Sequence, residues 1–257
     1  MCQSKGKGYA VLVGVNRVDE DQYGTDHWLN SPEKLVDYME HLLKGEGYQQ
    51  LKILKTEKAT KKSVLGALDS YLKLLTEKDI LVFYFAGHGS SVEGDPAAGA
   101  ATEHRDGRLV TFDQPIEDND LSALWESVGS AARLFAITDC CNSEGIIDHK
   151  SLRQGPGRQG AVKVVDPSRY PDPESDNDKK INMRVLHYGA SERDKLAWVG
   201  DFTCSMLAAL PSLPAGAGYR ELFVASSLLL RPDQSAIYDP WPVNAPWLKS
   251  QPFKIEM

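Results

Sequence analysis

The stretch ILVFYFAGHGSS, residues 80–91, decides the fold, because an apolar run leads directly into a histidine between two glycines. A continuous apolar run that ends in glycine is typical of a strand buried on both faces. A second stretch, LFAITDCCNSEG, residues 134–145, likewise passes from an apolar run into an aspartate, two cysteines and a polar turn. Functional side chains of open parallel sheets gather at the carboxyl ends of strands, so we expect both turns at one edge of a sheet.

Further strands and helices surround these two stretches. Tyr9–Asn16 is an apolar, β-branched run typical of a buried strand, and residues 51–54 predict a shorter one. Residues 31–47 predict a helix, with serine at the N-cap, proline at the first helical position and leucines at helical spacing. Residues 60–79 and 120–130 predict two more helices. Strands that alternate with helices predict a largely parallel sheet covered on both faces.

The composition changes in residues 149–182, which are rich in Pro, Gly, Asp and Lys and carry no long apolar repeat. A connection of this length is expected to be a functional loop or a linker. It separates a larger part, residues 1–148, from a smaller part, residues 183–257. The smaller part predicts one strand and two helices, at residues 183–191, 201–210 and 219–230.

Composition excludes several classes of function. The chain has 257 residues and a formal net charge of −7, which favours basic partners over the phosphate backbone of nucleic acids. No window approaches 18 consecutive apolar residues and the first residues lack a signal-peptide core, so we expect a cytoplasmic protein without membrane contact. The four cysteines lack the paired spacing of a zinc site and do not form a disulfide framework.

A thiol and an imidazole at one sheet edge are the minimum apparatus of a cysteine protease. The imidazole takes the thiol proton and the thiolate attacks a carbonyl carbon. His88 and Cys141 are 53 residues apart, and about 50 residues separate this pair in caspases. Alternation along the strand predicts that Cys140 points into the core and Cys141 toward a substrate.

The motifs YFAGHGS and DCCNSEG resemble the His-Gly and Asp-x-Cys-x-Ser-Gly motifs of metacaspases and related bacterial caspase-like peptidases. Residues 187–210, HYGASERDKLAWVGDFTCSMLAAL, are similar to the small-subunit strand of that family, its following loop and the Gly-x-Phe-Thr that starts the next helix. The resemblance implies a single caspase-like peptidase domain over residues 1–257. Its fold would be an α/β three-layer sandwich with a mostly parallel central sheet flanked by helices.

The resemblance also implies site residues. Cys141 matches the nucleophile, His88 the catalytic base, and the N–H groups of Gly89 and Cys141 the oxyanion hole. Asp139 matches the floor of the pocket for the residue before the cut bond, where a carboxylate favours Arg or Lys. Glu33 falls in the segment where metacaspases carry a second pocket acid. A bland alternative for Asp139 is a cap on nearby backbone N–H groups.

Many metacaspases bind calcium through an acidic loop that follows the His-Gly motif. The acids of the corresponding loop here are sparser than in that family, so no cofactor is expected to be required and calcium is only a candidate activator. The candidate oxygen ligands here are Glu93, Asp95, Asp106 and Asp113. One position departs from the family pattern, because Asn142 stands where the family often has histidine. The Lys and Arg side chains of residues 149–182 are either solubilising charge or sites of self-cleavage, as in a zymogen.

The function that these motifs predict is a cysteine endopeptidase that hydrolyses protein or peptide substrates after Arg or Lys through an acyl-enzyme. The expected partners are substrates with basic residues and an activating partner protein. Two alternatives stay open: a catalytically silent caspase-like scaffold or sensor, and another thiol-dependent hydrolase or ligase such as an asparaginyl peptidase. Trp198 and Trp247 either line a substrate groove or pack the C-terminal part.

Overall fold

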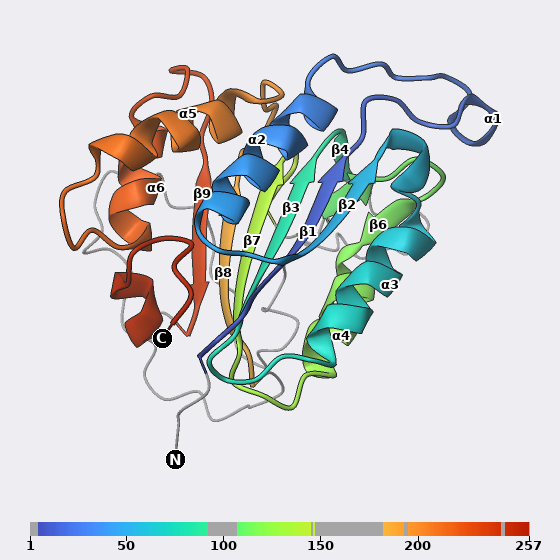
Figure 1. The fold of residues 1–257 in the computed structure, drawn as a ribbon. Coiled ribbons are helices and arrows are strands. Elements are labelled where there is room, and N and C mark those ends of the chain that lie inside the picture. The colour runs from blue at the N-terminus through green and yellow to red at the C-terminus, as the bar shows by residue number, and fades with distance from the viewer. Residues whose placement is uncertain are drawn as a thin grey trace, which may run out of the picture.

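A six-stranded sheet forms the centre of the molecule, in the order β2-β1-β3-β7-β8-β9 (Figure 1). The computed structural model describes residues 5–91, 107–144, 146, 182–192, 195–242 and 245–256. The strands are β1 (Gly8–Gly14), β2 (Gln50–Lys55), β3 (Ile80–Ala86), β7 (Arg133–Asp139), β8 (Arg184–Gly189) and β9 (Ile237–Trp241). The first five run parallel and β9 pairs antiparallel with β8.

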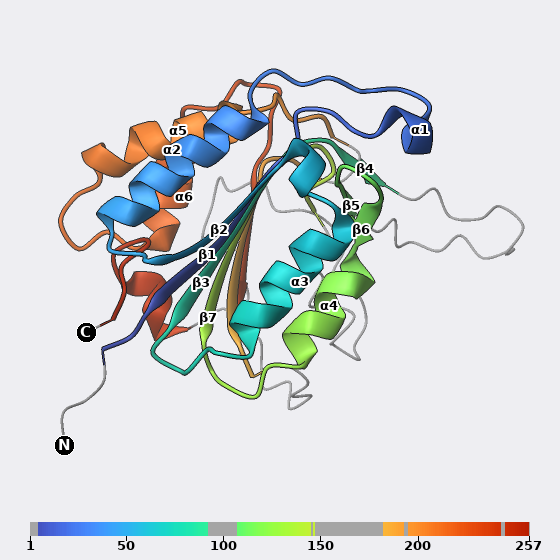
Figure 2. The ribbon, with the colours of Figure 1, turned by 45° about the vertical axis from the view of Figure 1, so that its right-hand side comes forward.

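Helices cover both faces of this sheet, as Figure 2 shows. One face carries α2 (Pro32–Gly45), α5 (Asp201–Ala209) and α6 (Tyr219–Ser227), and the other carries α3 (Lys61–Leu72) and α4 (Asp118–Glu126). Alternation along β1 divides the core, since Val11 and Val13 pack on the α3 side whereas Ala10 and Leu12 pack on the α2 side. The predicted α/β three-layer sandwich with a mostly parallel sheet is confirmed.

A second, antiparallel sheet begins at the residue after His88. It consists of β4 (Gly89–Ser91), β5 (Gly107–Val110) and β6 (Pro115–Glu117). The described residues also form a short helix α1 (Glu20–Tyr23) and 3-10 helices at Thr56–Lys58, Leu210–Ser212 and Pro246–Lys249. Because β4 is paired with β5, the backbone that follows His88 is held in place.

The predicted helices and strands of both parts of the chain are present, with ends that move by a few residues. The smaller part adds β8 and β9 to the same sheet as the larger part. Strand β9 was missed because it is short and contains Asp239 and Pro240, and proline is tolerated only where a sheet has an edge. None of the helices in the described part of the chain is long and apolar enough to cross a membrane.

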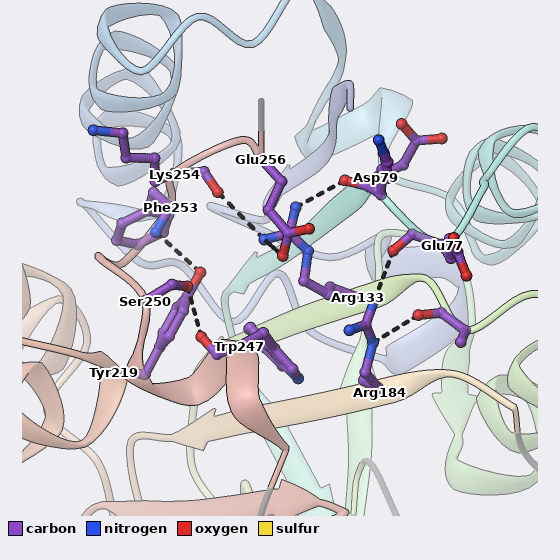
Figure 3. A network of polar contacts seen from close by, with 12 residues as sticks. Glu77, Asp79, Arg133, Arg184, Tyr219, Trp247, Ser250, Phe253, Lys254 and Glu256 are labelled. Carbon is purple, nitrogen blue, oxygen red and sulfur yellow. Dashed lines mark hydrogen bonds and ion pairs between the residues drawn. The ribbon is translucent and has the colours of Figure 1, made fainter. Parts of the chain in front are cut away.

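Figure 3 shows a polar network that holds the start of β7, at the opposite end of the strand from the cysteines. The Arg133 side chain is completely buried, lies 3.1 Å from a carboxylate oxygen of Glu256, and donates to the Lys78 carbonyl at 2.9 Å. The neighbouring Arg184 donates to two further carbonyl oxygens at the same end of the sheet. The C-terminal segment therefore closes over the start of the strand that carries the cysteine turn.

Candidate active site

The two motif turns meet at the carboxyl edge of the sheet. Strands β3 and β7 pair in parallel with Ala86 opposite Asp139, and both His88 and Cys141 lie two residues beyond that pair. A Cβ added at Gly89 would lie 1.9 Å from the carbonyl oxygen of Cys141, so only glycine allows this approach. The expectation that both turns share one edge is confirmed.

The His88 ring is oriented by a backbone carbonyl. Its Nε2 atom lies 2.9 Å from the carbonyl oxygen of His27, and a carbonyl can only accept, so Nε2 carries hydrogen in the neutral ring. That tautomer leaves Nδ1 free of hydrogen and able to take a proton. Burial lowers the pKa of His88 below its ordinary value, the bond to His27 raises it, and the nearby His27 ring lowers it again. The imidazole is therefore mostly neutral near pH 7.

The two thiols occupy different surroundings. Cys140 is completely buried, and burial raises the pKa of its thiol far above the ordinary range. Cys141 is partly exposed, and its Sγ lies 3.3 Å from the Ala197 N–H and 3.7 Å from the Ala197 carbonyl oxygen. The core position predicted for Cys140 is thus confirmed, and Cys141 is the more exposed of the two thiols.

Asn142 and Ser143 shape the turn after the nucleophile candidate. Asn142 has φ 52°, a left-handed conformation that asparagine adopts more readily than most residues. The buried Ser143 hydroxyl lies 3.1 Å from the Thr138 carbonyl oxygen and 2.5 Å from that of Cys140. The serine therefore closes the turn, and the departure at position 142 has a conformational reason.

The Gly89 amide points out of the small sheet. Gly89 pairs with Leu109, and Val110 N donates to the His88 carbonyl at 3.1 Å. In an antiparallel ladder this pattern makes Gly89 a residue of the non-hydrogen-bonded type, whose N–H is directed away from the partner strand. The amide is therefore not used by β5, as a donor for a substrate oxygen requires.

Asp139 is completely buried and ties β7 to the start of α5. Its carboxylate accepts from the Thr203 N–H at 3.0 Å, from the Thr203 hydroxyl at 2.5 Å and from the Gly200 N–H at 3.4 Å. Burial raises its pKa from 3.8 to about 6, although these hydrogen bonds act in the opposite direction. These bonds cap the start of α5, which lies far along the chain, and not the backbone of the cysteine turn. The role of Asp139 as a pocket acid stays a prediction.

The second predicted pocket acid, Glu33, lies in the first turn of α2. Glu33 follows the first residue of α2, its N–H donates to the Asn16 side chain at 3.0 Å, and its carboxylate accepts from the Thr56 hydroxyl. Asn16 and Thr56 follow β1 and β2, whereas Asp139 ends β7 on the far side of β3. No hydrogen bond in the described residues joins Glu33 to Asp139, and the role of Glu33 as a second pocket acid stays a prediction.

Three of the four calcium candidates, Glu93, Asp95 and Asp106, lie outside the described residues. Residues 149–181 of the expected linker also lie outside them. Asp113 is described, and its Oδ1 accepts from the backbone of Lys61 and Gln114 at 2.7 and 2.9 Å. Asp113 therefore accepts a hydrogen bond from the first residue of α3. Within the described ranges, no group of three His, Cys, Asp or Glu residues is placed to hold a metal ion.

The sequence did not predict several of the contacts that build this site. His27 acts through its backbone carbonyl, and Ala197 meets the thiol through its backbone from 56 positions along the chain. Ser191 lies with its hydroxyl 3.2 Å from the Cys140 carbonyl. Ser191, Ala197 and Thr203 all lie in the segment 187–210, whose resemblance to the family was recognised, but that resemblance did not reveal these contacts.

Comparison with known proteins agrees with this geometry. The family model described as metacaspase, peptidase C14 domain, matches residues 9–150. Metacaspase-7 of Arabidopsis thaliana is 28% identical over 96 residues, which cover 37% of this chain and 24% of that protein. Metacaspase-4 of the same plant is 25% identical over 145 residues, which cover 53% of this chain and 34% of that protein. The matched region thus spans about a quarter to a third of these relatives.

A solved structure extends the similarity of fold to nearly the whole chain. The crystal structure of protein GSU0716 from Geobacter sulfurreducens superimposes with a TM-score of 0.74 and 21% sequence identity. The superposition covers 98% of this chain and 100% of that one. At this identity the match shows the common fold.

Proposed function

The chain belongs to the metacaspase, peptidase C14 domain family, and on that premise we propose that it is a cysteine endopeptidase that cleaves protein substrates after Arg or Lys. One observation carries the proposal. His88 and Cys141 each follow by two residues the paired residues Ala86 and Asp139. Gly89 lies against the backbone of Cys141. A base, a nucleophile and a directed amide therefore meet at one edge of the sheet.

The chemistry follows from the tautomer of His88. Its Nδ1 takes the Cys141 proton, while the His27 carbonyl holds Nε2–H and stabilises the imidazolium that forms. The thiolate attacks the substrate carbonyl carbon, and the Gly89 and Cys141 N–H groups bind the resulting oxyanion. The C–N bond then breaks, the amine leaves with the proton from His88, and a thioester remains. Water attacks the thioester with His88 as base, which releases the acid and restores the thiol.

A preference for Arg or Lys is supported by the surroundings of Asp139. The hydrogen-bond donors to its carboxylate in the described residues are neutral groups of Gly200 and Thr203. The carboxylate is therefore an unpaired negative charge directly before the cysteine turn. A substrate guanidinium or ammonium group would supply the missing positive charge through charge-assisted hydrogen bonds. Calcium and an activating partner protein stay proposed regulators, and no step above depends on them.

Fluorogenic peptides that end in Arg, Lys, Asp or Asn test this function, with and without calcium. The wild type should cleave the Arg and Lys peptides, and Cys141→Ala should abolish cleavage. Cys140→Ala is the matched control, because the neighbouring buried thiol takes no part in the chemistry and the variant should keep most of the activity. Full activity of Cys141→Ala would overturn the mechanism, and silence of the wild type on all peptides would favour the scaffold alternative.

A further inference from the structure

In the connection between β8 and α5, two exposed apolar residues flank the residue whose backbone contacts the candidate nucleophile. Ala197 meets the Cys141 sulfur with its N–H at 3.3 Å. The residues on either side of it, Leu196 and Trp198, are 78% and 50% exposed. Apolar surface is therefore presented to solvent within one residue of the group that touches the thiol.

The Trp198 indole is exposed but held in place. The Arg231 guanidinium carbon lies 4.6 Å from the centre of its ring, and Arg231 is itself paired with Asp201 at 2.6 Å. The backbone N–H of Trp198 donates to the side-chain oxygen of Gln234 at 3.2 Å. The backbone carbonyl of Trp198 accepts from the Asp201 N–H at 3.0 Å. Gln234 is buried and donates to the Ala190 carbonyl at 2.9 Å. Contacts on the ring and at both ends of the residue thus fix the position of the indole.

Single exposed apolar side chains are ordinary on protein surfaces, but three observations set Trp198 apart. It directly follows the residue whose backbone contacts the thiol, it is pre-ordered, and the α6–β9 connection that supplies Arg231 also exposes Leu228 and Leu229. An aromatic side chain already fixed before binding loses little conformational entropy when a ligand covers it. Tryptophan is also among the residues that contribute most to binding when buried by a partner.

We propose that Trp198 is a specificity-determining residue that binds a bulky apolar side chain of the polypeptide substrate, within four positions of the cleaved bond. The inference rests on the proposed peptidase function and adds a second requirement to the basic residue. A basic side chain fits this place poorly, because Arg231 already stacks on the indole and repels a second cation. An acidic side chain gains little, because Asp201 already pairs with Arg231.

Internally quenched peptides with one fixed Lys at the cut test the proposal. Each flanking position is varied in turn among Leu, Phe, Ser, Lys and Glu, with wild type, Trp198→Ala and Trp198→Phe. At one position the wild type should favour Leu or Phe over Ser. Trp198→Ala should lose that preference through a KM raised about 10- to 30-fold for the apolar peptides, with kcat nearly unchanged.

Trp198→Phe keeps an aromatic face and should retain most of the preference. Leu74→Ala is the matched control, since Leu74 is 58% exposed but lies after α3 on the other face of the sheet, and it should behave as wild type. An equal preference in wild type and Trp198→Ala would overturn the proposal. A Trp198-dependent preference for Glu or Lys would also overturn it, because the ligand class would be wrong.

Calorimetry separates this inference from the proposed function. The same peptides are used with the scissile amide reduced to a methylene-amine, so that binding is measured without cleavage. Apolar preference in binding without any cleavage of normal peptides would remove the peptidase function and leave the apolar site. Cleavage without a preference that depends on Trp198 would remove the apolar site and leave the peptidase function.

Discussion

The buried carboxyl of Asp139 makes the stability of the fold depend on pH in a defined direction. Its pKa is raised from 3.8 to about 6, so the folded state holds a proton that the unfolded state has already lost between these values. The stabilisation is complete below pH 3.8 and disappears as the pH rises through about 6. Since one pKa unit corresponds to about 1.4 kcal/mol, this carboxyl lowers the free energy of unfolding by about 3 kcal/mol between pH 3.8 and pH 7.

The variant Asp139→Asn removes this titration. The free energies of unfolding of wild type and Asp139→Asn are measured in urea from pH 4 to pH 7. They should converge or cross as the pH rises, because the difference between them changes by about 3 kcal/mol. Asp37→Asn is the matched control, because its carboxylate lies on the exposed side of α2 and pairs with Lys55 at the surface. Parallel pH profiles for wild type and Asp139→Asn would refute the reasoning, since the carboxyl would then titrate alike in both states.

Substitutions at three further positions test the site and its supports. Gly89→Ala places a methyl group 1.9 Å from the Cys141 carbonyl oxygen and should lower kcat/KM at least about 100-fold, measured on an Arg peptide; activity within threefold of wild type contradicts the assigned contact. Asn142→Val forces a β-branched residue to φ 52° and should cost about 1–3 kcal/mol in urea unfolding, whereas Asn142→Gly should be nearly neutral. Glu256→Gln removes the carboxylate beside the buried Arg133 and should cost about 1–3 kcal/mol in the same assay; unchanged unfolding would show that the ion pair contributes nothing.

The sequence was most informative where local pattern and global fold agree. The apolar runs of β3 and β7 predicted buried parallel strands, and the residues after them predicted the two turns that meet at the carboxyl edge. Each inference needed only periodicity and the rule that parallel strands end together. The same pattern distinguished Cys140 from Cys141, because alternation along a strand continues into the first residue of the turn.

Contacts between distant segments could not be predicted in this way. Asp139 caps α5 from 61 residues away, and nothing in its own neighbourhood identifies Gly200 and Thr203 as partners. His27 orients the imidazole through a carbonyl oxygen that every residue possesses. Trp247, which sequence left open as a groove residue, is buried against Tyr219, since the tail folds back over α6.

Labelling with an irreversible inhibitor tests the dyad most directly. A peptidyl chloromethyl ketone with Arg next to the ketone is added to the purified protein, so that a thiolate displaces chloride and forms a stable thioether. Peptide mass spectrometry locates and counts the label as cleavage activity falls. We expect one label per chain, on Cys141 and not on the buried Cys140 or the exposed Cys204. The labelling rate should be at least about 10-fold lower in His88→Ala. Loss of activity with the label on another residue, or an unchanged rate in His88→Ala, would contradict it.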